Sequence, residues 1–496
     1  MHSAPGNRNK MLFVKQNRLS IYGFGIASTL ILMFGNVMFI QAHHYFWAYG
    51  IVAALTAFYL MLTYIVGLSG REFDLNEHNL KVAANIDKST SASIDVFLPI
   101  CGEPIEIIAN TWNHVSFMIQ NHEDAMVYVL DDRPTKANEE MAKQFGFKYV
   151  TRESNELKKA GNLRNAFAKT SGEFIAIFDA DFCPRRDFFI ETLPYLFDDA
   201  SIAIVQTPQF FETYSTNNWL MNAAGAVQEL FYRLIQVNRD RFGGSVCVGT
   251  NAGYRRSALK PFGGTAPVPY SEDVHTGFQL LSVGWKIKYI PLNLAEGICP
   301  DKLQPFFTQQ YRWAMGSISL FFSKKFWAAP ITKWQRVCYL TGMLFYMTTG
   351  IGVVVAPLPT LAMLSMFPDK VHWFNLLFAV PSLIFGTVFM AIWMKLPFTL
   401  DVIRVRQVSY FAHFFALIDF LTGRVEEWKP TGGSVSSRRY KLFRPAAFIL
   451  WGGSLIATTC MIVWRLTQGQ SPMDFALIAA FTVFNAWIFI PILEEI

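Results

Sequence analysis

Two long apolar runs near the N-terminus constrain the fold more than any other feature of the sequence. The first run, from Ile21 to Gln41, contains no charged residue, and a helix needs about 20 such residues to cross the hydrocarbon core of a bilayer. The run is too long for the core of a signal peptide, and no small-residue cleavage site follows it. A second run, from Tyr45 to Leu68, follows directly after His43 and His44, so we expect the two runs to form a membrane-spanning hairpin.

The C-terminal third of the chain repeats this pattern. Four further apolar runs of spanning length are Arg336–Phe367, Val371–Met394, Pro445–Trp464 and Asp474–Leu493. Basic residues stand before the first span and after the second, including Arg18 and Arg71, and before the fifth, including Arg444. Because basic residues favour the cytoplasmic side, we expect a multi-pass plasma-membrane protein with six spans, both termini and the large central segment being cytoplasmic.

The stretch between the fourth and fifth spans, residues 395–444, is more polar. Its first part, Thr399–Leu421, has charged residues such as Arg404, Arg406 and Asp419 among apolar ones, which is typical of an interfacial helix that lies on the membrane surface. Its second part, Thr422–Tyr440, contains Thr431-Gly432-Gly433-Ser434, a composition that indicates a loop.

The central segment, from residue 70 to about 330, has the pattern of a soluble domain. Short runs rich in Val, Ile, Phe and Tyr predict strands at Ser93–Pro99, Ala125–Leu130, Glu173–Phe178, Ile202–Gln206 and Trp285–Ile290, and helical patterns lie between the earlier ones, at Pro104–Gln120, Lys136–Gly146 and Asn162–Lys169. Strands that alternate with helices predict an α/β domain with a mostly parallel sheet. Such sheets bind their ligands at the carboxyl ends of the strands.

Charge and cysteine content exclude several classes of function. The net charge is +6 over 496 residues, and no dense stripe of Lys and Arg indicates a nucleic-acid partner. The six cysteines are scattered without CxxC spacing. They therefore predict neither a zinc site nor a disulfide framework.

Three acidic clusters stand where ligands of such a domain would bind. Asp131-Asp132 and Asp179-Ala180-Asp181 each follow an apolar strand, and Glu272-Asp273 follows a loop rich in Pro and Gly. A single acidic residue at a strand end is usually a turn or a helix cap. Three clusters in one domain favour a shared site, because carboxylates so placed converge on the crevice at the sheet edge.

The residue types suggest separate roles. The pair Asp179 and Asp181 could hold Mg²⁺ or Mn²⁺, which binds few protein carboxylates together with substrate phosphates. Asp273 could act as a general base, with its pKa raised by burial or by the adjacent Glu272. Lys159 precedes the predicted start of a helix and could add a cation for phosphate. The alternative for this lysine is an ordinary solvated side chain.

The segment Gln309-Gln310-Tyr311-Arg312-Trp313 joins the soluble domain to the membrane. In a helix, Gln309, Arg312 and Trp313 share one face. A guanidinium suits a pyrophosphate group, and an indole suits the flat face of a sugar ring. An amphipathic interfacial helix with an Arg-Trp anchor is the alternative.

These motifs, in this order, resemble the family 2 membrane-embedded processive glycosyltransferases, of which cellulose synthase is the nearest pattern. The resemblance is carried by Asp131-Asp132, Lys159-Ala160-Gly161-Asn162, Asp179-Ala180-Asp181, Gln206-Thr207-Pro208, Val248-Gly249-Thr250-Asn251, Ser271-Glu272-Asp273 and Gln309–Trp313. It covers the soluble domain almost end to end and the arrangement of spans around it.

The resemblance implies a fold and a division of the chain. The soluble part would be a cytosolic GT-A, Rossmann-like α/β domain inserted into an α-helical transmembrane bundle of six spans with interfacial helices. Residues 1–69 would form a cytosolic tail and two spans, 70–305 the glycosyltransferase domain, 306–333 the interfacial helices, and 334–496 the four other spans.

The resemblance also implies roles for individual residues. Asp131 and Asp132 would contact the nucleotide, with Asp132 favoured as the uracil contact. Asp179 and Asp181 would hold the metal and the diphosphate, and Lys159 would assist there. Asp273, with Glu272 beside it, would deprotonate the acceptor hydroxyl, so that inversion gives a β-linkage. The acceptor sugar would lie against Gly249, Thr250 and Asn251. Gln309 and Arg312 would hold the donor, and Trp313 would stack on the acceptor.

The sequence departs from the cellulose synthase pattern at several places. The gating loop of that family has the pattern FxVTxK, where this chain has Trp428-Lys429-Pro430-Thr431-Gly432-Gly433. Thr431 matches, and would contact substrate, but the Val and Lys positions do not match. Gln310 replaces an Arg that is common in cellulose synthases, and Ser271 replaces Thr. These differences concern the product and leave the chemistry unchanged.

We therefore expect an inverting, processive β-glycosyltransferase that polymerises a UDP-sugar and exports the polysaccharide. UDP-glucose is the favoured donor, giving cellulose or a mixed-linkage β-glucan, and mannan, chitin and hyaluronan are alternatives. The growing polysaccharide, the lipid bilayer and export or accessory proteins are the expected partners. A non-processive transferase to a lipid carrier and a transporter with a regulatory cytosolic domain are rival hypotheses.

Overall fold

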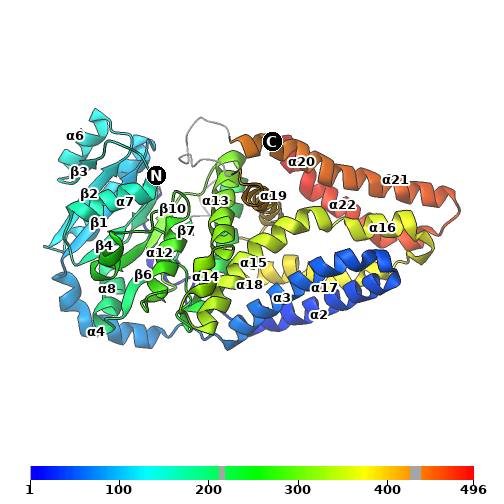
Figure 1. Cartoon of the computed structure of the whole chain (residues 1–496), viewed down its shortest axis with the longest axis horizontal. Helices are drawn as coiled ribbons and strands as arrows, with labels where there is room; N and C mark the ends of the chain where they lie inside the picture. The colour runs from blue at the N-terminus through cyan, green and yellow to red at the C-terminus, as the bar shows by residue number, and fades with distance from the viewer. Residues whose placement is uncertain (1, 212–217, 425–436, 496) are drawn as a thin grey trace.

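The structure of the chain is a computed structural model that describes residues 2–211, 218–424 and 437–495. An α/β domain forms one end of the molecule and a bundle of long helices forms the other (Figure 1). The α/β domain lies in the chain between the first helical hairpin of the bundle and its remaining helices. This confirms the predicted fold class of an α/β domain inserted into a transmembrane bundle.

A seven-stranded sheet with the order β3-β2-β1-β4-β8-β6-β9 forms the centre of the α/β domain. The strands are β1 (Ile94–Ile100), β2 (Ala125–Asp131), β3 (Lys148–Thr151), β4 (Phe174–Ile177), β6 (Ile202–Gln206), β8 (Ala252–Arg255) and β9 (Lys286–Tyr289). Neighbouring strands are parallel except that β8 runs antiparallel to both β4 and β6. The sequence predicted five of these strands but neither β3 nor β8, which are four residues long each.

A second, smaller sheet of three strands has the order β5-β10-β7. Its strands are β5 (Phe182–Pro184), β10 (Ala295–Gly297) and β7 (Phe210–Phe211). β10 pairs antiparallel with β5 and parallel with β7. Because β5 begins directly after Asp181, this sheet carries one end of the Asp179-Ala180-Asp181 loop.

Helices enclose the large sheet, so its central strands are buried; every residue of β1 is buried. Strands buried on both faces are typical of parallel sheets. The helices of this part of the chain are α4 (Leu75–Thr90), α5 (Ile105–Ile119), α6 (Lys136–Gln144), α7 (Lys158–Lys169), α8 (Phe188–Asp198), α9 (Trp219–Glu229), the π-helix η2 (Leu230–Ile235), α10 (Gln236–Asp240), α11 (Arg256–Leu259), η3 (Lys260–Phe262) and α12 (Glu272–Leu281). One prediction was wrong here: α7 begins at Lys158, so Lys159 lies in its first turn and not ahead of it.

Three helices form the junction with the bundle: α13 (Leu303–Phe321), α14 (Lys324–Ala328) and α19 (Leu400–Thr422). α19 packs against α13 and against α15 (Lys333–Val355), and its buried residues recur along its length, among them Val405, Val408 and Phe411. Figure 1 shows α19 almost end-on, across the direction of the long bundle helices. α19 therefore lies crosswise inside the junction.

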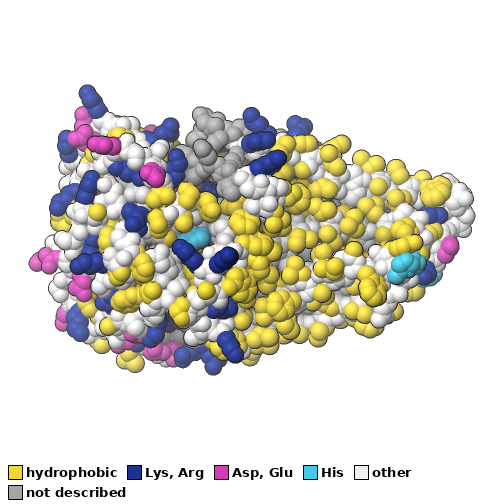
Figure 2. All heavy atoms as spheres, viewed as in Figure 1, with side chains coloured by type: hydrophobic (Ala, Val, Ile, Leu, Met, Phe, Trp, Pro, Cys, Tyr) yellow, Lys and Arg dark blue, Asp and Glu magenta, His cyan; other side chains and the backbone are white. Residues whose placement is uncertain are grey.

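The described residues contain six helical segments that are long and apolar enough to cross a membrane, at Arg18–Ala42, His44–Ser69, Lys333–Met366, Asn375–Trp393, Arg438–Thr467 and Pro472–Glu495. They comprise α2 (Arg18–Ala42), η1 (His44–Phe46), α3 (Trp47–Ser69), α15, α16 (Leu358–Met366), η5 (Asn375–Ala379), α17 (Val380–Ile384), η6 (Phe385–Phe389), α18 (Met390–Trp393), α20 (Arg438–Ala447), η7 (Phe448–Gly452), α21 (Gly453–Thr467) and α22 (Pro472–Glu495), with η4 (Pro368–Lys370) between two of them. Hydrophobic side chains cover this bundle in Figure 2, and charged side chains gather over the α/β domain and at the far tip. The chain is a multi-pass membrane protein.

A buried ion pair connects the α/β domain to the bundle. Glu229 at the end of α9 and Arg233 in η2 have fully buried side chains, and Arg233 Nη1 donates to Glu229 Oε1 over 2.6 Å. The same carboxylate accepts the backbone N–H groups of Lys395 and Leu396, just after α18, over 2.8–3.0 Å. Arg233 also donates to the carbonyl oxygen of Trp393 (2.9 Å). A soluble-domain carboxylate thus satisfies backbone donors at the end of a membrane helix.

Candidate active site

The loop Asp179-Ala180-Asp181 follows β4 at the carboxyl edge of the large sheet. Thr250 Oγ1 accepts the backbone N–H of Asp179 (2.9 Å), and Thr111 Oγ1 donates to the carbonyl oxygen of Ala180 (2.8 Å). Burial, together with the charge of Asp179, raises the pKa of Asp181 to about 7. A cation would stabilise two neighbouring carboxylates, because a nearby positive charge favours their ionised form.

The two carboxylates fit a magnesium or manganese ion as donors. No group of three or more His, Cys, Asp and Glu side chains in the described ranges could hold a metal. The protein would therefore supply two oxygen ligands from Asp179 and Asp181, and water and phosphate oxygens would supply the rest. Such sparse protein ligation is usual for Mg²⁺ at phosphate-binding sites.

Lys159, in the first turn of α7, lies at the centre of the acidic groups. Its Nζ pairs with Asp179, donates to the carbonyl oxygen of Gly249 (3.0 Å) and lies 3.9 Å from Glu272 Oε1. Burial alone would lower the pKa of Lys159, but the charges of Asp179 and Glu272 outweigh it and raise the pKa. Lys159 is therefore a fixed cation that links two of the predicted acidic clusters.

The third cluster opens α12. Asp273 Oδ1 accepts the backbone N–H of Val274 (2.8 Å), and burial, followed by the charge of Glu272, raises the pKa of Asp273 to about 7. Gly249 approaches this carboxylate closely, since a Cβ at Gly249 would lie 2.9 Å from the Cβ of Asp273. The φ of Gly249 is +77°, which also favours glycine. A larger residue there would displace Asp273.

Thr250 and Asn251 are buried and serve the framework. Besides holding Asp179, Thr250 accepts at its carbonyl oxygen a hydrogen bond from Gln206 Nε2 (2.9 Å). Asn251 Nδ2 donates to the carbonyl oxygen of Pro208 (3.2 Å). These contacts position the loops around the site, while the predicted sugar contacts of Gly249, Thr250 and Asn251 stay predictions.

The first acidic cluster, Asp131-Asp132, lies at the end of β2. Asp131 is fully buried and accepts hydrogen bonds from the Arg133 backbone (2.7 Å), Asn138 Nδ2 (2.9 Å) and Tyr149 Oη (2.7 Å). Asp132 forms a two-point pair with Arg152, whose Nε and Nη2 lie 2.6 and 2.8 Å from its oxygens. Both carboxylates are engaged by protein donors, and their contact with a nucleotide stays a prediction.

The predicted helix over Gln309–Trp313 is part of α13. Ser271 Oγ donates to the carbonyl oxygen of Arg312 (3.1 Å), and a Cβ at Gly316 would lie 2.2 Å from Ser271 Oγ. Burial lowers the pKa of Arg312, although the charge of Glu272 opposes this shift. α13 is thus docked against the start of α12, and Arg312 stands among the carboxylates.

Tyr311, on the other face of α13, holds the helix to the junction. Its hydroxyl donates to Asp419 Oδ2 (2.8 Å). Asp419 is fully buried in α19 and also pairs with Arg439 at the start of α20, whose Nε lies 2.7 Å from Oδ2. One buried carboxylate therefore joins three helices behind the site.

A cavity of about 270 Å³ starts at the third cluster and continues among the membrane helices. Asp273, Gln310, Trp313 and Ser317 line its start. Gln310 lies on this wall, and Gln309, Arg312 and Asp181 do not line it. The donor contacts of Gln309 and Arg312 stay predictions. Thr431 lies outside the described residues.

The deeper wall of the cavity is aromatic and carries polar groups. It is lined by Tyr59, Phe231, Tyr232, Tyr339, Phe345, Tyr346, Phe398, Tyr410 and His413, together with Arg239 and Arg406. Within the described residues, four buried polar atoms on this wall have no hydrogen-bond partner, namely Gln310 Nε2, Arg239 Nε, Tyr339 Oη and His413 Nε2.

Sequence reasoning missed two residues of the site. Glu103, just after β1, accepts the Cys101 backbone N–H (2.6 Å), and its charge helps to raise the pKa of Asp181. It follows a strand end as the other clusters do, so the same rule would have found it. Gln310 was noted only as a departure from the family pattern, because a helical period alone does not say which face meets a cavity.

Comparisons with known proteins match the same regions. Residues 95–263 match the family model described as Glycosyl transferase family 2, and residues 267–406 match the model described as Cellulose synthase. The chain is 32% identical over 319 residues to a cellulose synthase catalytic subunit [UDP-forming] from Pseudomonas fluorescens, covering 63% of this chain and 43% of the relative. It is 30% identical over 264 residues to the protein of the same name from Xanthomonas axonopodis pv. citri, covering 52% of this chain and 36% of the relative.

The chain thus spans less than half the length of these two curated relatives. Among solved structures, a mannosyltransferase from Pyrobaculum calidifontis in complex with GDP-Man and Mn²⁺ superposes with a TM-score of 0.52 at 15% identity, covering 76% of this chain and 99% of that one. This likeness supports the GT-A fold of the α/β domain.

Proposed function

Because the chain belongs to the cellulose synthase-like family 2 glycosyltransferases, we propose that it polymerises a UDP-sugar by inverting, processive transfer and moves the polysaccharide across the membrane. One observation carries the proposal. Asp273 and Trp313 line a single cavity that continues among the membrane helices. The proposed base, the aromatic ring proposed to stack on the acceptor, and a path for the polymer would thus share one cavity.

In the proposed reaction, Asp273 accepts the proton of the acceptor hydroxyl. The hydroxyl oxygen then bonds to the anomeric carbon of the donor as the bond to the diphosphate breaks, and UDP leaves. The raised pKa of Asp273 makes it a stronger base than an exposed aspartate. Attack from the side opposite the leaving group inverts the anomeric carbon and gives a β-linkage.

The donor would lie between the first two acidic clusters and α13. Asp179 and Asp181 would hold the metal ion, which would neutralise the charge of the departing diphosphate. Lys159 and Arg312 are the cations beside this position, and Asp131 and Asp132 lie at the end of β2, where the nucleoside would bind. Both Mg²⁺ and Mn²⁺ suit these oxygen ligands.

The polymer would occupy the cavity beyond Trp313. Aromatic side chains would offer flat apolar faces to sugar rings, and the polar side chains of Gln310, Arg239 and His413 line the same cavity. A wall of this kind holds a sugar chain without a single tight site. It therefore suits a product that must advance after each addition.

Glucose is the sugar that we favour, because the curated relatives are named as UDP-forming cellulose synthases. Mannan, chitin and hyaluronan would require the same chemistry at the anomeric carbon. We further propose the domain limits 1–69, 70–305, 306–333 and 334–496, with the α/β domain and both termini in the cytoplasm of a plasma-membrane protein. Export or accessory proteins would carry the polymer onward.

The test is to incubate the purified protein in proteoliposomes with UDP-glucose and other UDP-sugars, with Mg²⁺ or Mn²⁺. We expect UDP release and a long product that only a linkage-specific β-glucanase digests. Polymer protected inside the vesicles would support translocation. UDP release without a long product on gel filtration would favour transfer to a lipid carrier, and no UDP release with any donor would favour a transporter.

A further inference from the structure

Residues 2–16, which we call the N-terminal strap, lie along the α/β domain before α2 begins. Figure 1 marks the N-terminus at the α/β domain. The strap contains the short helix α1 (Asn7–Lys10), and Phe13 in it is 1% exposed and packs edge-on against Phe210 of β7 with ring centroids 5.7 Å apart. The strap is therefore packed into the domain.

The tip of the strap contacts the predicted metal-binding loop. His2 Nε2 lies 3.1 Å from the carbonyl oxygen of Asp181 and 3.2 Å from Cys183 Sγ. Asn110 Nδ2 in α5 donates to the carbonyl oxygen of His2 (2.9 Å). Asp181 is thus contacted by a residue 179 positions earlier in the chain, and the same His2 nitrogen contacts Cys183.

The loop needs such support because the sheet that carries it is small. The strands β5, β10 and β7 contain three, three and two residues, and so few ladder hydrogen bonds give little independent stability. The strap contacts residues at or beside each strand. Asn293, before β10, donates its backbone N–H to the carbonyl oxygen of Lys10 (3.0 Å) and its side chain to that of Asn9 (2.8 Å).

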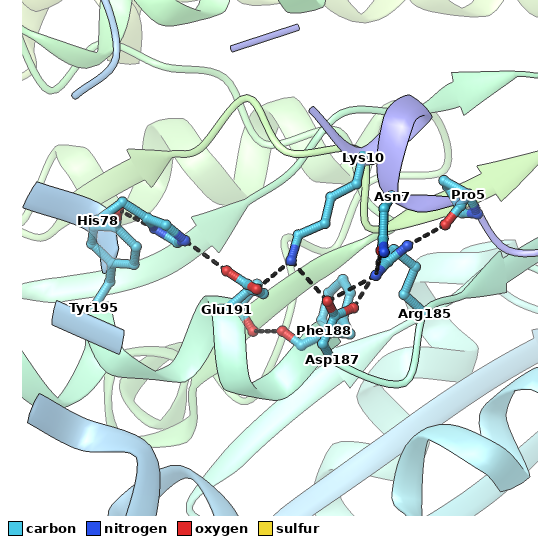
Figure 3. Close-up of polar contacts among 10 residues, drawn as sticks. Pro5, Asn7, Lys10, His78, Arg185, Asp187, Phe188, Glu191 and Tyr195 are labelled. Atoms are coloured by element: carbon cyan, nitrogen blue, oxygen red, sulfur yellow. Dashed lines mark hydrogen bonds and ion pairs between the residues drawn. The ribbon is translucent and has the colours of Figure 1, made fainter. Parts of the chain in front are cut away.

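Figure 3 shows the polar contacts that anchor the middle of the strap. Lys10 Nζ donates to Asp187 Oδ2 (2.8 Å) and pairs with Glu191 of α8. Arg185, directly after β5, donates to Asn7 Oδ1 (3.0 Å) and to the carbonyl oxygen of Pro5. Lys10 of the strap thus contacts the domain, and Arg185 of the domain contacts the strap.

Both carboxylates in this network have a second partner besides Lys10. Asp187 is also paired with Arg185 (2.7 Å), and Glu191 Oε2 lies 2.6 Å from His78 Nε2. Removing the Lys10 ammonium would therefore leave each carboxylate with one partner. This makes Lys10 a position where the strap can be loosened while each carboxylate keeps one partner.

The other end of the strap joins the bundle. Arg233 Nε donates to the carbonyl oxygen of Lys15 (2.8 Å), and Trp393 Nε1 donates to that of Asn17 (3.3 Å). Gln16 is fully buried and accepts the backbone N–H of Phe73 (3.3 Å). The strap is thus held at the metal loop, at the small sheet and at the membrane junction.

We propose that the N-terminal strap positions the metal-binding loop, with His2 and Lys10 as positioning residues, so that loosening the strap weakens the metal-dependent binding of a nucleoside diphosphate while the domain stays folded. The metal and nucleotide part of this inference rests on the proposed function. The contact between His2 and the loop does not.

The test uses the full-length protein with Lys10→Met and His2→Ala, and Lys15→Met as the control. Lys15 is in the same strap and loses the same charge, but its side chain is exposed. We expect both strap variants to bind UDP in the presence of Mn²⁺ about tenfold more weakly, the equivalent of about one lost hydrogen bond. We expect Cys183 to be alkylated by N-ethylmaleimide faster than in the wild type, as measured by peptide mass spectrometry. Lys10→Arg should restore both properties.

Buried Cys247 and Cys338 lie away from the strap and report on unfolding. Faster labelling of Cys183 alone, with weaker Mn²⁺-dependent UDP binding, would support the proposal. Wild-type labelling of Cys183 and wild-type UDP affinity in both strap variants would overturn it, as would equal acceleration at all three cysteines. If the wild type itself bound no UDP with Mn²⁺, the proposed function would fail, and Cys183 labelling would still decide whether the strap holds the loop.

Discussion

Replacing Asp273 by Asn tests the assignment of the general base most directly. The substitution keeps the size of the side chain and removes its ability to take up a proton. Loss of a general base lowers turnover about 10²- to 10⁴-fold, which corresponds to about 3–5.5 kcal/mol of activation free energy. UDP binding should not weaken, because the change removes a negative charge from a site that already contains Asp179 and Glu272.

The pH dependence gives a second measure of the same group. Burial and Glu272 raise the pKa of Asp273 to about 7, so the active carboxylate form is lost as the pH falls through that value. At pH 6 only about a tenth of the molecules would carry the carboxylate, and kcat/KM would be about tenfold below its plateau. Glu272→Gln removes the adjacent negative charge and should move the profile to lower pH.

The assay is UDP release over pH 5–9 in parallel with calorimetric UDP binding in the presence of Mn²⁺. The reasoning would be refuted if Asp273→Asn kept more than a tenth of the wild-type turnover, or kept the wild-type pH profile. Loss of UDP binding with an intact fold would assign Asp273 to donor binding instead.

Three further changes test other parts of the molecule. Asp181→Ala should abolish the Mn²⁺ dependence of UDP binding, because one of two oxygen ligands is lost; a titration that keeps its metal dependence would contradict this. Trp313→Ala should raise the KM for the acceptor far more than it weakens UDP binding. An equal effect on both would argue against stacking of Trp313 on the sugar. Asp419→Ala should destabilise the protein by about 3–5 kcal/mol, because Arg439 is left unpaired. Tyr311→Phe should cost about 1.5–3 kcal/mol, because only one hydrogen bond to the charge is lost. Thermal unfolding in detergent should rank these two variants in that order.

The sequence predicts the architecture well where a long-range pattern repeats. The six apolar runs predict the six spanning helices, and the runs in β1, β2 and β6 are long and apolar enough to be recognised. β3 and β8 escape prediction because their sequences, Lys-Tyr-Val-Thr and Ala-Gly-Tyr-Arg, are not apolar runs. The start of α7 was misplaced because Leu157 and Lys158 have positive φ values, a local geometry that residue type does not indicate.

The candidate site was only partly predictable, because residue type does not indicate how its elements are oriented against one another. Acidic residues at strand ends point to the crevice, and Lys159 does lie among Asp179, Gly249 and Glu272. Which member of Gln309-Gln310 meets the cavity depends on the rotation of α13 against α12. That rotation is set by Ser271 and Gly316. The contact of His2 with Asp181 joins residues too far apart in the chain for any local pattern to reveal it.

The buried pair of Glu229 and Arg233 has a practical consequence for isolating the α/β domain without the membrane helices. Cutting the chain before the fourth membrane helix would remove the backbone N–H groups of Lys395 and Leu396. The Glu229 carboxylate would then lose these two donors. Truncated fragments should therefore aggregate. The α/β domain should be obtainable in a native state only together with the membrane helices, in detergent or lipid.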